Sequence, residues 1–264
     1  MLALLLLALA PLAIWLGQTS ILLIARLPVR WRISSADLPR SIKRANRVLL
    51  NGVMGAVLLA YPLLRDQTPI EYFAAFFPLD GHAYEMLTGA AAAVLYLALL
   101  YGVWLATDNV RCGVRHSGAT LARRLATVPL MAIAAATVEE LLFRAVLLAG
   151  LLESFPFAIA MVLGVVIFAA AHYIRSVKRY WTFPGHLALG ALFCVAFACT
   201  HTLWLPIGLH AGGILMLMGI RPFARYIGPP WLVGASIFPY AGVPGIVALL
   251  LLSINVWLRY GEAA

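Results

Sequence analysis

Long apolar runs constrain this chain most, because they recur along its whole length. A helix needs roughly 17–25 predominantly apolar residues to cross a bilayer. Runs of about that length cover residues 2–24, 48–64, 88–106, 126–150, 155–174, 184–200, 203–219 and 238–258. Soluble domains carry roughly 25% charged residues, whereas this chain carries 11% and has a mean hydropathy of +0.96. We therefore expect an all-α, polytopic membrane protein with about eight transmembrane helices and a buried polar site between its core helices.

The basic residues gather in alternate connections between these runs. They fill the connections after the first, third, fifth and seventh runs, whereas most acidic loop residues lie in the others. By the positive-inside rule, the basic connections are cytoplasmic and both termini lie outside. The net charge of +9 then reflects topology and contact with the lipid bilayer, and we expect no nucleic-acid partner. We expect a multi-pass protein of a bacterial inner (cytoplasmic) membrane.

The chain has the organisation of a single membrane domain over residues 1–264. Its longest connections, about 25–47 and 65–87, are too short to form separate domains. Residues 1–120 are expected to supply N-terminal helices of unclear role. The cysteines are odd in number and lack the spacing of metal ligands, so we expect neither a disulfide framework nor a zinc knuckle.

Three charged residues stand inside the fourth run. A charged side chain at the bilayer centre costs about 2.5–3.5 kcal/mol, so such residues usually face the protein interior and serve transport or chemistry. Glu140 and Arg144 are four residues apart and share a helix face, whereas Glu139 points about 100° away from Glu140. We expect Arg144 to hold Glu140 while Glu139 projects elsewhere as a candidate general base. The alternative is a structural ion pair between helices.

Two histidines stand inside other runs. His172 follows Phe168 by about one helical turn, and His210 lies in the seventh run. Small residues flank both histidines, so neighbouring helices can approach closely and a peptide would have room. Two histidines on different helices, together with the carboxylates, favour a shared site over separate hydrogen-bonded core histidines. His186 and His201 are predicted to be interfacial anchors.

These polar residues resemble the three motifs of a known family. They are Glu139-Glu140 with Arg144, then Phe168 with His172, then His210. The pattern is similar to that of the CPBP family, the CAAX-processing and bacteriocin-processing (Abi) intramembrane proteases. The resemblance covers a catalytic core at about residues 125–220. One departure is Ile214, because the family often has a polar residue at this position, four after the third-motif histidine.

The resemblance implies a glutamate-dependent endopeptidase, in which a glutamate activates water while histidines assist and stabilise the oxyanion. Carried onto this chain, Glu139 is the base, and Glu140 pairs with Arg144 and orients the site. His172 and His210 complete the catalytic set. The two glutamates could exchange these roles. Phe168 is predicted to contact substrate. The expected partner is a membrane-anchored protein or peptide.

Other readings of the same residues stay open. His172, His210 and Glu139 form the His₂Glu set that catalytic zinc uses, but no HExxH pair is present, and we expect no cofactor. A proton- or cation-coupled transporter could use the carboxylates and His172 as a relay. Transporters usually show internal repeats, which are not apparent here. A catalytically silent membrane scaffold, such as an immunity protein, is the remaining alternative.

Overall fold

The computed structural model describes residues 1–29, 38–80, 82–114, 118–173, 180–235 and 238–261. Its long helices are α1 (Leu2–Ile24), α2 (Arg40–Leu63), α4 (Tyr84–Ala106), α5 (Gly118–Glu140), α7 (Phe157–Ala171), α8 (Phe183–Thr200), α9 (Trp204–Ile220) and α11 (Val243–Tyr260). Short helical segments are α3 (Pro69–Ala74), η1 (Leu141–Leu148), α6 (Ala149–Leu152), η2 (Tyr180–Thr182), α10 (Pro230–Val233) and η3 (Pro239–Ala241). Each predicted apolar run overlaps one of the long helices, so the all-α membrane class is confirmed.

The helices differ in whether their length and composition suit a membrane span. Five helical segments of the described chain are long and apolar enough to cross a membrane: α1, α2, α4, α11 and the continuous segment Tyr180–Thr200, which consists of η2 and α8. The apolar helices α7 and α9 are shorter. The α5 helix is less apolar, because Arg123 and Arg124 lie near its start and Glu139 and Glu140 end it. The described residues thus support a multi-pass protein without confirming eight spans.

A short β-ribbon departs from the expected all-helical pattern. The strands β1 (Val110–Cys112) and β2 (Ala224–Tyr226) pair antiparallel, with Val110 opposite Tyr226. The ribbon joins the connection after α4 to the connection after α9, and the hydroxyls of Tyr101 and Tyr226 hydrogen-bond beside it. Three-residue strands carry too little alternation to be recognised in a sequence. Both connections were predicted to lie on the same, cytoplasmic side.

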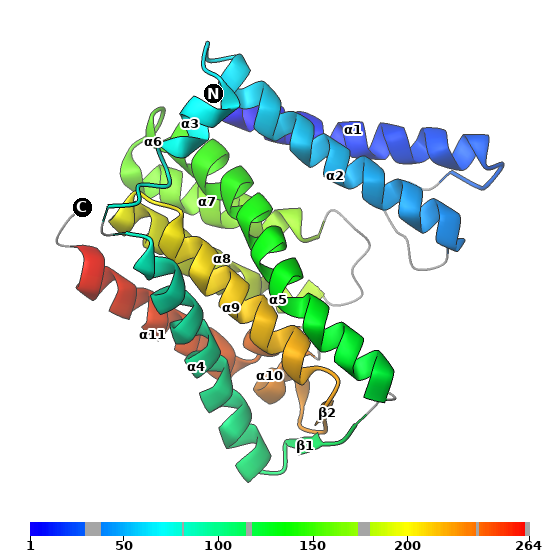
Figure 1. Cartoon of the computed structure of the whole chain (residues 1–264), viewed down its shortest axis with the longest axis vertical. Coiled ribbons are helices and arrows are strands. Elements are labelled where there is room, and N and C mark those ends of the chain that lie inside the picture. Colours follow the sequence, from blue (N-terminus) through cyan, green and yellow to red (C-terminus); the bar gives the residue numbers. More distant parts are fainter. Residues whose placement is uncertain (30–37, 81, 115–117, 174–179, 236–237, 262–264) are drawn as a thin grey trace.

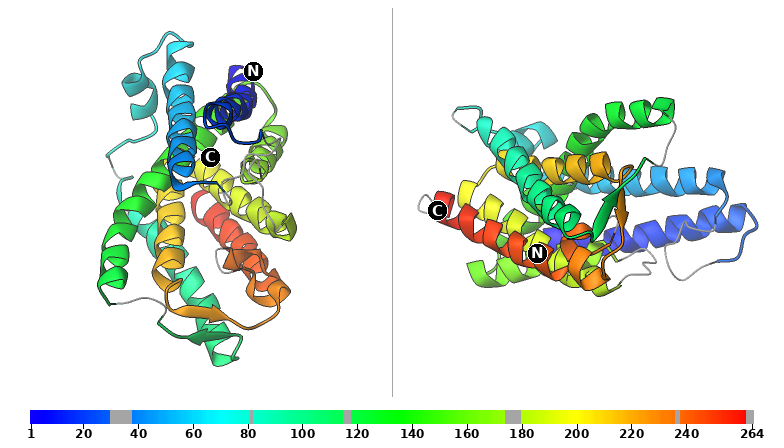
Figure 2. Two further views of the ribbon diagram at one scale, coloured as in Figure 1. Left: turned by 90° about the vertical axis from the view of Figure 1, so that its right-hand side faces the viewer. Right: turned by 90° about the horizontal axis from the view of Figure 1, so that it is seen from below.

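The helices form one bundle with a projecting hairpin. Figure 1 shows α4, α5, α9 and α11 crossing the molecule together, whereas α1 and α2 pack on each other and extend away from the bundle. The N-terminus lies toward the upper end of that view, and the β-ribbon lies at the lower end. The right-hand view of Figure 2 also shows α1 and α2 extending away from the other helices. Several helices expose large apolar side chains, as expected for surfaces that face lipid.

The closest helix contact is made by glycines of α9 against α4. A Cβ atom on Gly208 would lie 2.1 Å from the carbonyl oxygen of Met86, and one on Gly212 would lie 2.5 Å from that of Ala90. Glycine is therefore required where the two backbones touch. The predicted close approach around the third motif is confirmed, and it fixes α9 next to the core.

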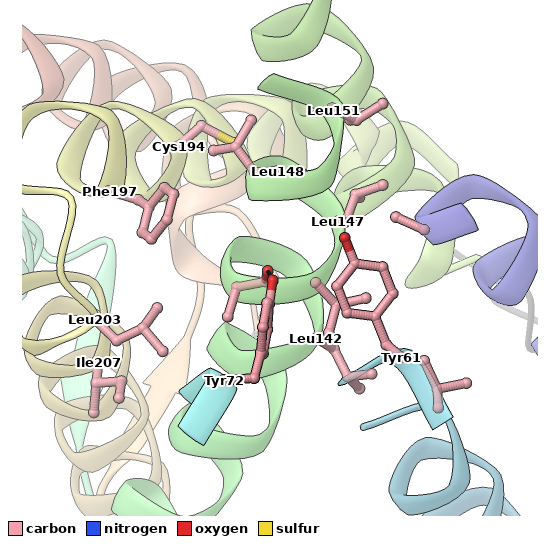
Figure 3. Close-up of a cluster of buried hydrophobic side chains, with 14 of the residues drawn as sticks. Tyr61, Tyr72, Leu142, Leu147, Leu148, Leu151, Cys194, Phe197, Leu203 and Ile207 are labelled. Carbon is pink, nitrogen blue, oxygen red and sulfur yellow. Dashed lines mark hydrogen bonds between the residues drawn. The ribbon is translucent and has the colours of Figure 1, made fainter. Parts of the chain in front are cut away.

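The segment that follows Glu140 is buried on all sides. Figure 3 shows Tyr61 on one side of η1 and Phe197, Leu203 and Ile207 on the other, with Tyr72 between them. The Tyr72 hydroxyl donates a hydrogen bond to the backbone carbonyl of Ala145 within η1. Packing from α2, α3, α8 and α9 thus holds this helical segment in place.

Candidate functional site

The two adjacent glutamates stand where one type of helix changes into another. Glu139 and Glu140 are the last residues of α5, and the chain continues without a break as the π-helix η1. Wider π-helical turns are rare and often occur at functional sites. Arg144 lies on η1, so the fourth predicted run supplies three charged groups from one continuous helical segment.

Glu140 is the fully buried centre of the cluster. Its Oε2 lies 3.1 Å from Arg144 Nε, and its Oε1 accepts a hydrogen bond of 3.4 Å from Arg144 Nη1. The same Oε1 lies 2.7 Å from His210 Nδ1. The pairing of Glu140 with Arg144, expected from their spacing, is therefore present. An imidazole on α9 is joined to the same carboxylate.

Arg144 is held by more than its carboxylate partner. A buried charge needs several partners to offset its desolvation, and the Arg144 side chain has no exposed surface. Its Nη2 donates a hydrogen bond of 3.4 Å to the carbonyl of Gly190. Its Cζ lies 4.6 Å from the centre of the Phe168 ring and 5.1 Å from that of Phe193. These contacts with two ring faces are cation–π interactions.

Glu139 is the accessible carboxylate. Its side chain is 34% exposed, and its Oε2 lies 4.0 Å from His172 Nε2 and 3.8 Å from His210 Nε2. Both separations are longer than a direct hydrogen bond. A small polar group placed between these three atoms could contact all of them. The structure thus brings together Glu139, Glu140, Arg144, His172 and His210 from α5, η1, the end of α7 and α9.

The hydrogen bonds at Nδ1 determine how each histidine faces Glu139. His172 Nδ1 lies 2.9 Å from the backbone carbonyl of Phe168, and a carbonyl can only accept, so Nδ1 carries the hydrogen. His210 Nδ1 likewise donates to Glu140, whose carboxylate is paired with Arg144. The Nε2 atoms toward Glu139 therefore accept hydrogen bonds when the rings are neutral. They donate only when the rings are protonated.

The predicted substrate contact at Phe168 is not supported by its position. Its side chain is completely buried and its ring packs against Arg144, Phe143 and His172. A side chain enclosed by the protein in this way does not present its surface to a substrate. Phe168 instead supports the guanidinium and the neighbouring imidazole.

Two residues near the site were not identified from the sequence. Phe193 stacks on His210, with ring centres 4.7 Å apart and an interplanar angle of 24°. His186, predicted to be an interfacial anchor, is only 1% exposed, and its ring centre lies 4.8 Å from that of His172. That prediction was wrong because the first turn of α8 packs against the end of α7. Neither contact has a sequence signal, since each joins separate helices.

The alternative zinc set is not favoured by the distances. Two ligands of one tetrahedral zinc would lie about 3.3 Å apart, which is closer than Glu139 Oε2 is to His172 Nε2 or His210 Nε2. Across the part of the chain that the structure describes, no group of three His, Cys, Asp or Glu side chains is arranged to hold a metal ion. The five residues can instead position a carboxylate beside two imidazoles.

Comparison with known proteins supports the resemblance noted in the sequence. Residues 121–216 match the family model described as "Type II CAAX prenyl endopeptidase Rce1-like". The matched segment begins in α5 and ends in α9, and it contains every charged and imidazole group that meets at Glu139. No curated protein and no solved structure matched the chain.

Proposed function

We propose that this multi-pass membrane protein hydrolyses a peptide bond in a membrane-associated protein or peptide, since residues 121–216 match the Rce1-like family of CAAX prenyl endopeptidases. The position of Glu139 carries the proposal, because its Oε2 lies 4.0 and 3.8 Å from the Nε2 atoms of His172 and His210. A carboxylate can take a proton from water. Protonated imidazoles beside it can stabilise a developing oxyanion.

The different burial of the two glutamates supports different roles. Glu139 is partly exposed, whereas Glu140 has no exposed side-chain surface and is bound to Arg144 and His210. A general base must reach the water that it activates, so Glu139 is the better candidate. Glu140 then holds His210 in one orientation and shares its charge with Arg144.

The charges of the cluster suit hydrolysis without a cofactor. Two carboxylates and one guanidinium leave one negative charge, and a proton on one of the two histidines balances it. Such a proton sits on Nε2, because Nδ1 already carries a hydrogen in both rings. The protonated histidine can then donate a hydrogen bond toward a carbonyl oxygen next to Glu139.

The reaction follows from these positions. Glu139 accepts a proton from water as the water oxygen attacks the peptide carbonyl carbon, and the carbonyl oxygen becomes an oxyanion. The protonated histidine donates a hydrogen bond to this oxyanion. The C–N bond then breaks, and the proton held by Glu139 passes to the departing amine nitrogen. One water and one peptide bond give a carboxylic acid and an amine.

The proposed substrate reaches the site near the end of α7. An open cavity of about 530 Å³ is lined there by Ala170, Tyr173, Tyr180 and Phe183, next in sequence to His172. Its lining is mostly aromatic, which suits an apolar group of a membrane-anchored chain. The description of the matched family makes a prenylated CAAX peptide the first substrate to test.

A fluorogenic peptide assay tests the function. The purified full-length protein in lipid vesicles would be mixed with a farnesylated CAAX peptide that carries a fluorophore and a quencher across its C-terminal bonds. Wild type should cleave it, and Glu139→Gln should reduce kcat by about 10²–10⁴-fold, the usual contribution of a general base. Asp66→Asn, a change of the same kind at an exposed loop position, should leave cleavage unchanged.

Other outcomes of this assay would contradict the proposal. Equal cleavage by wild type and Glu139→Gln would remove Glu139 as the base. Loss of activity to a chelator, with recovery on adding zinc, would replace the metal-free mechanism. A wild type that cleaves nothing but carries a Glu139-dependent cation flux across the vesicles would favour the transporter.

A further inference from the structure

We propose that His186 is a positioning residue for His172, and that Tyr240 holds it in a single neutral form. The effect of this contact on the reaction rests on the proposed function, but the contact itself does not. Tyr240 lies on η3, after the family match ends at residue 216. The C-terminal part of the chain therefore completes a site whose other members lie within the matched segment.

His186 is held from several directions. Its Nδ1 lies 3.1 Å from the Thr182 carbonyl and 3.1 Å from the Tyr173 hydroxyl, and its Nε2 lies 3.3 Å from the Tyr240 hydroxyl. The Thr182 carbonyl can only accept, so Nδ1 carries the hydrogen. Nε2 is then the acceptor for the Tyr240 O–H. Both ring nitrogens are satisfied in the neutral Nδ1–H tautomer.

His172 needs this support because of where it lies. It follows the last residue of α7 as the helix cap, and its side chain is 28% exposed. One neighbour of its ring is Phe168, with ring centres 4.8 Å apart, and another is His186, at the same distance with an angle of 42° between planes. The ring of His186 limits how far His172 can rotate away from Glu139.

The support behind His186 is itself rigid. A Cβ atom on Gly185 would lie 2.6 Å from the Cα of Ala241, and one on Gly245 would lie 2.6 Å from the Cα of Tyr240. These close backbone contacts press η3 against the first turn of α8 and the start of α11. The Tyr240 hydroxyl is therefore placed by backbone packing and not by a flexible loop.

A neutral His186 suits a neighbour that carries a proton. Two positive rings with centres 4.8 Å apart would repel each other, whereas a neutral aromatic ring can pack against an imidazolium. The titratable groups that contact His186 are His172 and Tyr173 at the end of α7 and Tyr240 on η3. Glu139 lies beyond His172. Because His186 stays neutral, the one extra proton that His172 and His186 could share is carried by His172, beside Glu139.

NMR tests the contact without any substrate. Full-length protein labelled with ¹⁵N-histidine in micelles should show His186 as the neutral Nδ1–H tautomer from about pH 5 to 8, the range in which ordinary histidines titrate. His186→Phe and Tyr240→Phe should both change the ¹⁵N signals of the His172 ring. Tyr96→Phe is the matched control, because it removes a nearby tyrosine hydroxyl bonded to the Gly245 carbonyl. It should leave His172 unchanged.

The peptide assay tests the consequence for the reaction. His186→Phe keeps an aromatic ring but loses both ring nitrogens. Tyr240→Phe removes only one hydroxyl, so it provides the test if His186→Phe does not fold. Each should lower kcat by roughly 10- to 100-fold, as expected when a reacting group moves by up to about 1 Å, with little change in KM. His201→Asn, at the exposed end of α8, should have no effect.

The two measurements separate the failure of the inference from the failure of the proposed function. If the ¹⁵N signals of the His172 ring are identical in wild type, His186→Phe and Tyr240→Phe, or if His186 titrates like an exposed histidine, the positioning role is wrong. If the NMR result holds but wild type cleaves no peptide, the contact stands and the protease proposal fails.

Discussion

At the scale of single residues, Glu139 and Glu140 are adjacent in the chain but have opposite surroundings. One carboxylate is partly exposed and faces two imidazole Nε2 atoms at 3.8 and 4.0 Å, and the other is enclosed with Arg144 and His210. A helix places successive side chains about 100° apart, so adjacent residues can separate in this way. The same substitution at the two positions should have different effects.

Stability should distinguish the two glutamates. Glu140→Gln leaves Arg144 without its charged partner, and breaking a buried ion pair costs about 3–5 kcal/mol. Glu139→Gln removes a charge that is one-third exposed, so its effect should stay within about 0.5 kcal/mol, as at most surface positions. Unfolding of the purified variants in micelles measures both. Equal losses of stability would mean that Glu140 is not the structural member of the pair.

Phe193 should affect activity separately from stability. Phe193→Leu removes the ring that stacks on His210 and contacts Arg144. A cation–π contact of about 0.5–2 kcal/mol corresponds to a ~2–30-fold loss of kcat. The matched control is Phe197→Leu, one turn further along α8 and equally buried, whose ring contacts Phe76.

Both phenylalanine variants should lose similar stability in thermal unfolding, and only Phe193→Leu should lose activity in the peptide assay. An active Phe193→Leu variant would show that the guanidinium and the imidazole do not depend on this ring.

Residue spacing could predict contacts within one helix but not contacts between helices. The pairing of Glu140 with Arg144 follows from the i,i+4 geometry of a single segment. The neighbours His186 and Phe193 come from α8 and reach the site through packing, which leaves no periodic pattern to recognise. The burial of Phe168 has the same origin, because its ring packs against Phe193 and Gly190 of α8.

At the scale of secondary structure, the apolar runs predicted the position of every long helix, but they did not predict the π-helical turns or the β-ribbon. The π-helix η1 and the β-ribbon both depend on tertiary partners, namely the core around Tyr72 and the pairing of two distant connections. Glycines near His210 did predict a close helix approach, and the structure shows that the partner of α9 is α4. That contact gives a prediction with a control on the same helix.

Alanine at two glycines of α9 should have opposite effects. Gly208→Ala would bring its Cβ to within 2.1 Å of the Met86 carbonyl, and overpacking of this kind costs about 1–3 kcal/mol. Because His210 is two residues away, peptide cleavage should fall as well. Gly213 has no atom within 4 Å of its built Cβ, so Gly213→Ala should be neutral or stabilising by up to ~1 kcal/mol through helix propensity.

Thermal unfolding and the peptide assay measure both alanine variants. A stable, active Gly208→Ala protein would contradict the close packing of α4 on α9.

At the scale of the whole molecule, the predicted topology places the basic connections on the cytoplasmic side of the membrane. The basic connections were predicted to be cytoplasmic from charge alone, and the β-ribbon joins two of them. The N-terminus lies toward the opposite end of the bundle (Figure 1). A natural probe is available, because Cys112 is exposed on β1 whereas Cys194 and Cys199 are buried.

Labelling with a membrane-impermeant maleimide checks this orientation. Cys112 should react in inside-out vesicles and stay protected in intact cells, and Cys112→Ser should abolish that labelling. Gln67→Cys in a Cys112→Ser background, in the exposed connection after α2, should react from the other side. Labelling of Cys112 in intact cells would reverse the predicted topology and move the basic connections outside.

The identity of the substrate lies beyond what the sequence could predict. The charged and imidazole groups were predictable as a set, because lipid makes buried charges costly and therefore conspicuous. Substrate choice depends on surfaces around them, such as the cavity lined by Tyr173, Tyr180 and Phe183, which form only on folding.

Mass spectrometry of membrane proteins from cells that express equal amounts of wild type or Glu139→Gln tests the central claim most directly. If Glu139 activates water for peptide hydrolysis, at least one membrane-anchored protein should keep an uncleaved terminus in the variant cells and lose it in wild type. Identical protein termini in the two cell lines, with both proteins folded and present in the membrane, would contradict the account.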